Sequence, residues 1–507
     1  MGSEPSDRTS LKSTLVYAAS LLGILLLFLA LSISTILSRR VVANEGWFAD
    51  PAYHLLATGS LRTTILESKG TWLAGIDRHT YWILPLHPLI QAPWYKLFGF
   101  SLWSLRALST AWGVVALCAW FLITRKLFDR SLAIVATLLI AVDYHFTLDS
   151  ALGRMDMMCA ALGFSGLAAF LWLRERSLPW SLFAACSLIA AACLTHPCGI
   201  LAAFALVALA LKLDRRHLTP VVVLLAVLPF AIAATAYGLY IAQAPDDFWR
   251  QFTGNISGIA GESEGVRRFY ALGSPLSAMK DELMFRYVSA FSAGGDWSSP
   301  FQLQVVVLIA YGGALVSILI DRRLRQTAGV GTLLMLTLLT LVALCFLDGL
   351  KQKPYLVQTV PYLAALTAVW IWSWTERRPR LRPWIIGLLV LAQVASTAAA
   401  VRENSYRSEY LSAADYLKAH AAPNDLITGG GEFAFTFGYD ANLTDDVRLG
   451  YFSGRQGRFY VQNRWYKEWL QTSAKTDPAA HQHVQDLLDT RYREVLRNPG
   501  YTIYELR

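Results

Sequence analysis

The sequence predicts a mainly α-helical membrane protein, in which about eleven transmembrane helices form a bundle and a small α/β domain follows. Three observations point to this fold class. The 507-residue chain is 55% hydrophobic, which is too apolar for an ordinary soluble globule. Basic residues cluster at every second gap between the apolar stretches. Beyond Arg402 the hydropathy falls, and short helix and strand patterns replace the long apolar stretches.

The basic clusters set the predicted topology. Positive charge marks the cytoplasmic ends of membrane helices, so the loops that carry these clusters are predicted to lie in the cytoplasm. This places the N-terminus inside and the C-terminal segment outside, which requires an odd number of crossings. The clusters also account for the net charge of +9, so the basicity does not point to nucleic-acid binding. They are Arg125, Lys126 and Arg130; Arg174 and Arg176; Lys212, Arg215 and Arg216; Arg322, Arg323 and Arg325; and Arg377, Arg378, Arg380 and Arg382.

Eleven apolar stretches approach the length of about 20 residues that a helix needs to cross the hydrocarbon core. The first, roughly residues 14–38, is longer than the apolar core of a signal peptide, about 7–15 residues, so we expect a retained helix. The predicted spans begin near Thr14, Arg106, Ser131, Asp156, Ser181, Pro197, Thr219, Gln302, Gly329, Tyr355 and Trp384.

The segments predicted on the outer side carry most of the polar residues. The loop of residues 39–104 is rich in tryptophan, tyrosine and proline, which favours helices lying in the membrane interface. A turn at 143–155 and a loop at 243–301 follow. We expect residues 1–402 to form the transmembrane domain and 403–507 an α/β domain. The elements predicted in the second domain are a helix at 410–420, a strand beginning at 425–428, a helix at 484–497 and a strand at 501–506.

Several classes of protein are disfavoured by missing motifs. All six cysteines lie in or beside apolar stretches, so neither a disulfide framework nor a CxxC zinc site is indicated. No glycine-rich phosphate loop, HExxH or GxSxG motif occurs in a usable context. This argues against an ATP-driven pump, a zinc protease and an α/β-hydrolase.

Two carboxylates follow the first predicted helix closely. Glu45 and Asp50 are expected at the membrane boundary, where partial desolvation raises a carboxyl pKa and can prepare the group to act as a base. The alternative is that Glu45 caps the helix that follows and Asp50 is merely solvated.

A second acidic group, Asp143, Asp149 and Asp156, lies at the outer mouth of the fourth predicted span. Asp156 is two residues after Arg154. Charged residues at a membrane boundary cost several kcal/mol unless they are paired or line a wet cavity, so this pair is a candidate site. The alternative is a structural Arg154–Asp156 pair that only orients the helix.

Cationic and polar residues accompany the acids on the predicted outer side. His196 lies in a tight turn between two spans, where a lone histidine is more often a structural hydrogen-bonded residue than a base. Lys351, Lys353 and Tyr355 lie close together, against the charge trend of the other loops. Two lysines there suggest an anion, and a lipid-linked phosphate is the natural candidate.

Two further groups are weaker candidates. Basic residues of the third outer loop could add to the positive field, although a solvated surface is the simpler interpretation. Aromatic residues of the C-terminal segment could stack on sugars, although core packing is their more common role. These residues are Arg267, Arg268, Lys280 and Arg286, and Tyr451, Phe452, Phe459, Tyr460, Trp465, Tyr466 and Trp469.

Taken in order, these motifs resemble the protein O-mannosyltransferase and lipid A aminoarabinose transferase superfamily, membrane glycosyltransferases of the GT-C fold. The likeness covers roughly residues 14–402. It is carried by the acid after the first helix, interfacial helices that end in Lys96-Leu97-Phe98-Gly99-Phe100, Arg106 at the second helix, Arg154-Met155-Asp156, Thr195-His196-Pro197, and Lys353-Pro354-Tyr355 through Pro361.

The resemblance implies an inverting enzyme that moves a sugar from a polyprenyl-phosphate carrier to a lipid, glycan or protein acceptor on the outer face of the membrane. It places Glu45 in the acidic pair of the first loop and Asp156 in the acid position of the Arg-x-acid motif. Asn44 departs from the family's usual Asp-Glu pair. The resembled proteins mostly work without a metal, so no cofactor is expected, although carboxylates near phosphate could hold Mg²⁺ or Mn²⁺.

The expected chemistry needs a base for the acceptor hydroxyl and cationic donors for the leaving phosphate. We expect Glu45, or failing it Asp50, to be the base and Asp156 to orient the acceptor or Arg154. Phosphate binding is assigned to Arg154, Lys351, Lys353, Tyr355 and His196. A lipid transporter or flippase and a non-catalytic assembly factor are the alternatives. The cysteine usage is compatible with a bacterial inner membrane.

Overall fold

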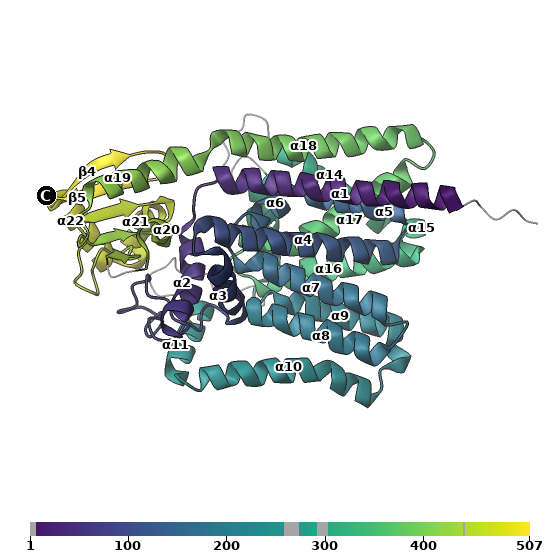
Figure 1. The fold of residues 1–507 in the computed structure, drawn as a ribbon, viewed down its shortest axis with the longest axis horizontal. Helices are drawn as coiled ribbons and strands as arrows, with labels where there is room; N and C mark the ends of the chain where they lie inside the picture. Colours follow the sequence, from purple (N-terminus) through teal and green to yellow (C-terminus); the bar gives the residue numbers. More distant parts are fainter. Residues whose placement is uncertain (1–6, 258–272, 292–302, 440–441) are drawn as a thin grey trace, which may run out of the picture.

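In the computed structural model, residues 7–257, 273–291, 303–439 and 442–507 are described. Within them, each of the eleven predicted spans coincides with a helix of the bundle in Figure 1. Eight helices are long and apolar enough to cross a membrane, and a bent pair makes a possible ninth. The bundle helices are α1 (Asp7–Ser38), α4 (Leu102–Leu127), α5 (Arg130–Val142), α7 (Met155–Leu173), α8 (Leu178–Thr195), α9 (Gly199–Asp214), α10 (Pro220–Ile241), α14 (Leu303–Ile320), α16 (Ala328–Leu347), α17 (Val360–Trp374) and α18 (Arg382–Glu403).

The third predicted span, which begins near Ser131, corresponds to a bent pair of helices. Helices α5 and α6 (Tyr144–Ser150) meet at 64°. Asp143 stands at the bend, where one carboxylate oxygen accepts the backbone N–H groups of the first turn of α6. Its other oxygen accepts hydrogen bonds from Tyr311 and Gln393, each at 2.7 Å. Asp143 is therefore a helix cap with a fully satisfied carboxylate.

Shorter helices lie at both ends of the bundle, and the end that faces the sheet is called here the domain end. Figure 1 shows α2 and α3 between the bundle and the C-terminal domain, as expected for helices outside the spans. The short helices are α2 (Ala43–Thr58), α3 (Leu86–Phe98), α11 (Pro245–Ser257), α12 (Pro275–Asp281), a π-helical turn (Glu282–Val288), α13 (Ser289–Phe291), α15 (Arg322–Gln326) and 3₁₀ turns at Arg215–His217, Lys353–Gln358 and Pro379–Leu381. The basic helix α15 lies at the end of the bundle opposite the sheet.

The C-terminal domain is a five-stranded mixed sheet with helices, and α18 leads directly into it (Figure 1). The strand order is β2-β1-β3-β5-β4, with β1 parallel to β2 and β3 and the other pairs antiparallel. Its elements are a π-helical turn (Tyr406–Leu411), α19 (Ser412–His420), β1 (Ile427–Gly429), a 3₁₀ turn (Gly431–Phe433), α20 (Ala434–Phe437), β2 (Leu443–Thr444), β3 (Phe459–Gln462), α21 (Arg464–Thr476), α22 (Pro478–Thr490), β4 (Tyr492–Arg497) and β5 (Thr502–Leu506).

The predicted α/β character of this domain is confirmed, but one of its predicted helices is wrong in its second half. Residues 484–490 are helical, whereas 492–497 form β4. The strand pairs with β5 from Tyr492 opposite Leu506 onward, so tertiary pairing with the last strand overrides the local helical pattern. Strand β3 and helix α21 were not predicted.

The weaker candidates fall mostly into ordinary roles. Arg267 and Arg268 lie outside the described residues. Lys280 is exposed, but Arg286 is fully buried, which contradicts a solvated surface. Of the seven aromatic residues, Phe459, Tyr460, Tyr466 and Trp469 are core residues, and Tyr451, Phe452 and Trp465 are exposed.

Helix α2 packs directly on the sheet domain, backbone against backbone. A Cβ atom on Gly46 would lie 1.9 Å from the carbonyl oxygen of Gly431, which follows β1. The Asp445 carboxylate bridges the two elements, since it accepts hydrogen bonds from Trp47 Nε1 and from the Gly431 N–H, both at 2.7 Å. Only glycine at position 46 permits this approach.

We expect Gly46→Ala to lower stability by on the order of 1–3 kcal/mol, because the added methyl must push backbone atoms apart. Alanine is otherwise the better helix former by about 1 kcal/mol, so a loss would report the clash. Thermal unfolding and proteolysis of the C-terminal domain measure the effect. Gly23→Ala is the matched control, because its Cβ would meet open space. Equal stability of the two variants would contradict the packing described.

Candidate active site

A cavity of about 120 Å³, called here the central cavity, opens at the domain end of the bundle. It lies where α2, the start of α7, the turn between α8 and α9, and the segment before α17 meet. Three of the predicted site residues line it together, namely Arg154, His196 and Tyr355. The full lining is Asn44, Trp47, Phe48, Trp82, Leu84, Arg154, Met155, Thr195, His196, Pro197, Asn255, Gln352 and Tyr355.

The Arg154–Asp156 pair stands at the start of α7. Arg154 Nε lies 2.7 Å from Asp156 Oδ2, and both side chains are buried. Asp156 occupies the first helical turn, where the helix dipole favours negative charge. Its second oxygen, Oδ1, has no hydrogen-bond partner among the described residues. The guanidinium also lies 5.2 Å above the centre of the Phe48 ring, a cation–π contact that fixes it beside the cavity.

His196 and Tyr355 form the opposite wall. The His196 Nδ1 atom accepts a hydrogen bond from the Cys198 N–H at 3.2 Å. The neutral imidazole therefore carries its proton on Nε2 and donates it to the Tyr355 hydroxyl, 3.3 Å away. His196 also interacts electrostatically with Asp156. Arg154, Asp156, His196 and Tyr355 thus form one connected polar group.

His87 of α3 joins the electrostatic surroundings of this group and was not predicted. It interacts with Asp156, Arg154 and His196, and burial lowers its pKa to about 3. The imidazole therefore stays neutral at physiological pH. No sequence signal separates this histidine from an ordinary core residue.

Glu45 has a different environment from the one expected of a base. Both of its oxygens are held by the fully buried Arg106, with Nε–Oε1 and Nη2–Oε2 distances of 2.8 Å. Oε1 also accepts the N–H of Gly153 at 2.8 Å, and Oε2 accepts the N–H of Val42 at 3.1 Å. This is the helix-capping alternative, and it leaves no lone pair directed to a substrate.

Asp50 is likewise engaged within the protein. Its Oδ2 accepts the backbone N–H groups of Thr64 and Ile65 at 2.7 and 3.0 Å, and Oδ1 lies 3.2 Å from His54 Nε2. Burial raises the pKa of Asp50, and the bonds to His54 and the backbone oppose that rise. The residue is buried rather than solvated, and it does not line the central cavity.

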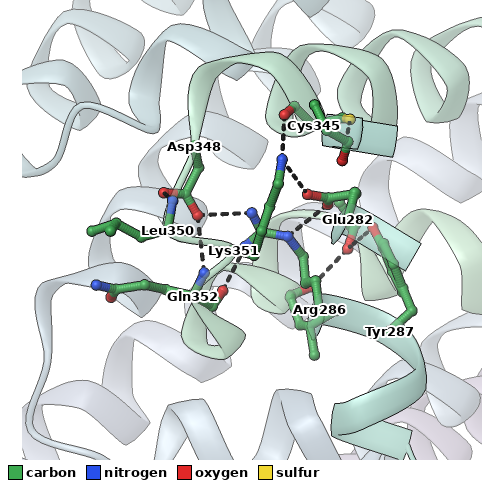
Figure 2. A network of polar contacts seen from close by, with 11 residues as sticks. Glu282, Arg286, Tyr287, Cys345, Asp348, Leu350, Lys351 and Gln352 are labelled. Atoms are coloured by element: carbon green, nitrogen blue, oxygen red, sulfur yellow. Dashed lines mark hydrogen bonds and ion pairs between the residues drawn. The ribbon is translucent and has the colours of Figure 1, made fainter. Parts of the chain in front are cut away.

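Lys351 belongs to a buried ionic network, shown in Figure 2. Its Nζ lies 2.5 Å from the Cys345 carbonyl oxygen and 3.2 Å from Glu282 Oε2. Arg286 connects Glu282 to Asp348, at 2.6 and 2.7 Å, so two cations balance two anions. The ammonium group of Lys351 is thus paired within the protein, and the expected phosphate contact by this residue stays a prediction.

The network supports the cavity indirectly. Arg286 donates to the Gln352 carbonyl oxygen at 2.5 Å, and Asp348 accepts the Gln352 N–H at 3.0 Å. Gln352 lines the central cavity, which the sequence analysis did not predict. Lys353, the next residue, is exposed and does not line this cavity.

Asn44 and Trp47 were also missed as cavity residues. Both come from the first turns of α2, on either side of Gly46 and the anchored Glu45. The Asn44 side-chain oxygen is buried without a hydrogen-bond partner in the described part of the chain. The departure from an Asp-Glu pair was the one sequence signal that marked position 44.

No group of three or more His, Cys, Asp or Glu side chains suited to a metal occurs among residues 7–257, 273–291, 303–439 and 442–507. The expectation of no cofactor stays a prediction.

Comparison with known proteins places this geometry in a wider context. The chain is similar to the solved structure of ArnT from Cupriavidus metallidurans in the apo state, at 14% identity and a TM-score of 0.62, over 98% of both chains. The same protein bound to undecaprenyl phosphate matches at 14% identity and a TM-score of 0.62, over 97% of this chain and 98% of that one. The chain has the GT-C fold. The predicted fold is thereby confirmed.

Two further comparisons agree with this fold. The Archaeoglobus fulgidus oligosaccharyltransferase in complex with Zn and sulfate matches at 13% identity and a TM-score of 0.54, over 95% of this chain and 73% of that one. A family model described as dolichyl-phosphate-mannose-protein mannosyltransferase matches residues 79–239, about a third of the chain. No curated protein matches the sequence.

We expect Glu45→Gln to destabilise the protein by about 3–5 kcal/mol, because Arg106 would remain buried without its counter-charge. Thermal unfolding in detergent measures this loss. Glu494→Gln is the control, since Glu494 forms only a surface pair with Arg497, typically worth about 0–1 kcal/mol. A Glu45→Gln variant that unfolds like the wild type yet transfers no sugar would restore Glu45 as the base.

Proposed function

We propose that this chain is an inverting glycosyltransferase that moves a sugar from a polyprenyl-phosphate carrier to an acceptor. The GT-C fold over nearly the whole chain supports this, as does the similarity to a structure that holds undecaprenyl phosphate. The observation that carries the proposal is the meeting of Arg154, His196 and Tyr355 at one cavity at the domain end, with Asp156 paired to Arg154. A transporter would be expected to place such groups near mid-membrane.

The reaction breaks the bond between the anomeric carbon and the phosphate oxygen and joins that carbon to the acceptor oxygen. The phosphate keeps the electron pair, and Arg154, with the hydroxyl hydrogen of Tyr355, stabilises the negative charge, while His196 orients that hydroxyl. The acceptor proton goes to a carboxylate. We assign this role to Asp156, because it is paired with Arg154 of the cavity wall and its Oδ1 has no hydrogen-bond partner among the described residues, whereas both oxygens of Glu45 are held by Arg106. No divalent cation is required in this scheme.

The donor and acceptor are proposed at the level of class. The transferred sugar is a hexose or a pentose, and the acceptor is a lipid, a glycan or a protein. The carrier is held with its phosphate beside Arg154. The apolar faces of the surrounding helices accommodate its prenyl chain.

We expect Arg154→Gln and Asp156→Asn each to lower sugar transfer by about 10²-fold or more, the usual cost of losing one transition-state charge contact. The rate of sugar transfer is measured in proteoliposomes with radiolabelled, undecaprenyl-phosphate-linked donors. Arg497→Gln, a surface change in β4, is the control. Full activity in both site variants would refute the assignment of this cavity.

We also propose that the chain spans a bacterial inner membrane, with the N-terminus in the cytoplasm and the C-terminal domain outside. The basic α15 at the end of the bundle opposite the sheet supports this orientation. The catalytic cavity would then face the extracytoplasmic side.

An alkaline phosphatase fusion after Arg507 is expected to be active in intact cells, and a fusion after Arg325 inactive. The enzyme folds only outside the cytoplasm, so its activity reports the side of the membrane that each position occupies. The reverse pattern would invert the proposed topology.

A further inference from the structure

A second cavity of about 370 Å³ adjoins the central one. The two share Asn44, Trp47 and Gln352, so they lie on either side of these side chains. This adjoining cavity lies between the start of α2, the start of α21 and the glycine-rich turn after β1. It therefore connects the proposed reaction centre to the C-terminal domain.

Two tryptophans give the adjoining cavity flat apolar walls. Trp47 of α2 and Trp465 of α21 lie with ring centres 6.4 Å apart and ring planes at 80°. Trp465 is 39% exposed, although its neighbours Tyr466 and Trp469 are core residues. An indole face exposed inside a cavity is suited to the C–H face of a sugar ring, and its N–H to a polar group.

Glu432 brings a buried carboxylate to the same space, where it interacts with the Tyr501 hydroxyl. The side chain is 1% exposed, and its Oε1 accepts a hydrogen bond from Asn463 Nδ2 at 3.1 Å. Its Oε2 has no hydrogen-bond partner among the described residues. A Cβ atom at Gly430 would lie 2.1 Å from this oxygen, so the glycine leaves room for it. The carboxylate therefore retains hydrogen-bonding capacity beyond its contacts with Asn463 and Tyr501.

The charges around the cavity disfavour an anionic ligand. Its two arginines are already paired, Arg40 with Glu409 at 3.0 Å and Arg464 with Glu468 at 2.8 Å. The remaining polar groups are carboxylate, amide and indole, which are hydrogen-bonding partners for neutral hydroxyls. This combination differs from the arginine-centred phosphate site of the central cavity.

We propose that the adjoining cavity binds the carbohydrate portion of the acceptor. Trp47 and Trp465 stack on a sugar ring, and Glu432 with Asn463 holds its hydroxyl groups. Asn44 and Gln352 line the passage through which the reacting hydroxyl reaches the central cavity. The inference rests on the proposed function and narrows its acceptor to a free glycan or the sugar part of a glycolipid.

The test uses saturation-transfer NMR on the full chain in nanodiscs. One arm titrates the soluble disaccharides chitobiose and lactose, and the other incorporates a glucosyl diacylglycerol into the disc. Saturation of sugar protons is expected in at least one arm, and the arm that responds identifies a free or a lipid-linked source. Glu432→Gln and Trp465→Phe are each expected to weaken binding about tenfold, and Glu494→Gln to leave it unchanged.

Undecaprenyl phosphate binding to the same samples separates this inference from the proposed function. It should be equal in the wild type and in both cavity variants. Trp465 is partly exposed, so Trp465→Phe keeps the test valid even if Glu432→Gln fails to fold. No sugar binding by the wild type, or undiminished binding by a folded variant, would overturn the carbohydrate subsite. Loss of carrier binding by the wild type would instead count against the proposed function.

Discussion

The buried ion pair between Glu45 and Arg106 is the constraint on which the site depends. Arg106 also donates to the carbonyl oxygens of Ile36, Arg39 and Arg40, so it ties the end of α1 to the start of α2. Burying two charges is tolerable only when nearly all their hydrogen-bonding capacity is used, which leaves little freedom of position. Glu45 accepts a hydrogen bond from the N–H of Gly153, the residue before Arg154, and it follows Asn44 in the chain. It therefore positions two cavity residues without lining the cavity itself. The cavity residues are fixed because their chain neighbours are.

The C-terminal domain completes the site rather than merely covering it. The contact of Gly46 with Gly431 and the Asp445 bridge bring the glycine-rich turn after β1 to the start of α2. Because β1 is parallel to β2 and β3, the carboxyl ends of these strands lie at the same edge of the sheet. Ligand sites in α/β proteins often lie at such an edge. The C-terminal domain thus lines the adjoining cavity, whereas the central cavity is lined by residues that precede this domain.

The sequence predicted local features well and partnerships poorly. The eleven helices of the bundle were predicted because apolar length is a property of each segment. Arg154, His196 and Tyr355 were singled out because polar residues at a membrane boundary are unusual. The ion pairs of Glu45 and Lys351 were not predicted because their partners, Arg106 and Glu282, lie 61 and 69 positions away along the chain. Strand β4 was not predicted for the same reason, because it is stabilised as a strand by its pairing with β5. Asn44, Trp47 and Gln352 carry no charge that would mark them.

The ionic network in Figure 2 has a consequence for how this protein can evolve. Glu282, Arg286, Asp348 and Lys351 are buried, and their formal charges sum to zero. Replacing one of these residues alone leaves a buried charge without its counter-charge. Replacing an acid and a base together by apolar residues keeps the region neutral. Divergence at these positions should therefore proceed in compensated pairs, so that the network drifts as a unit while Gln352 stays in place.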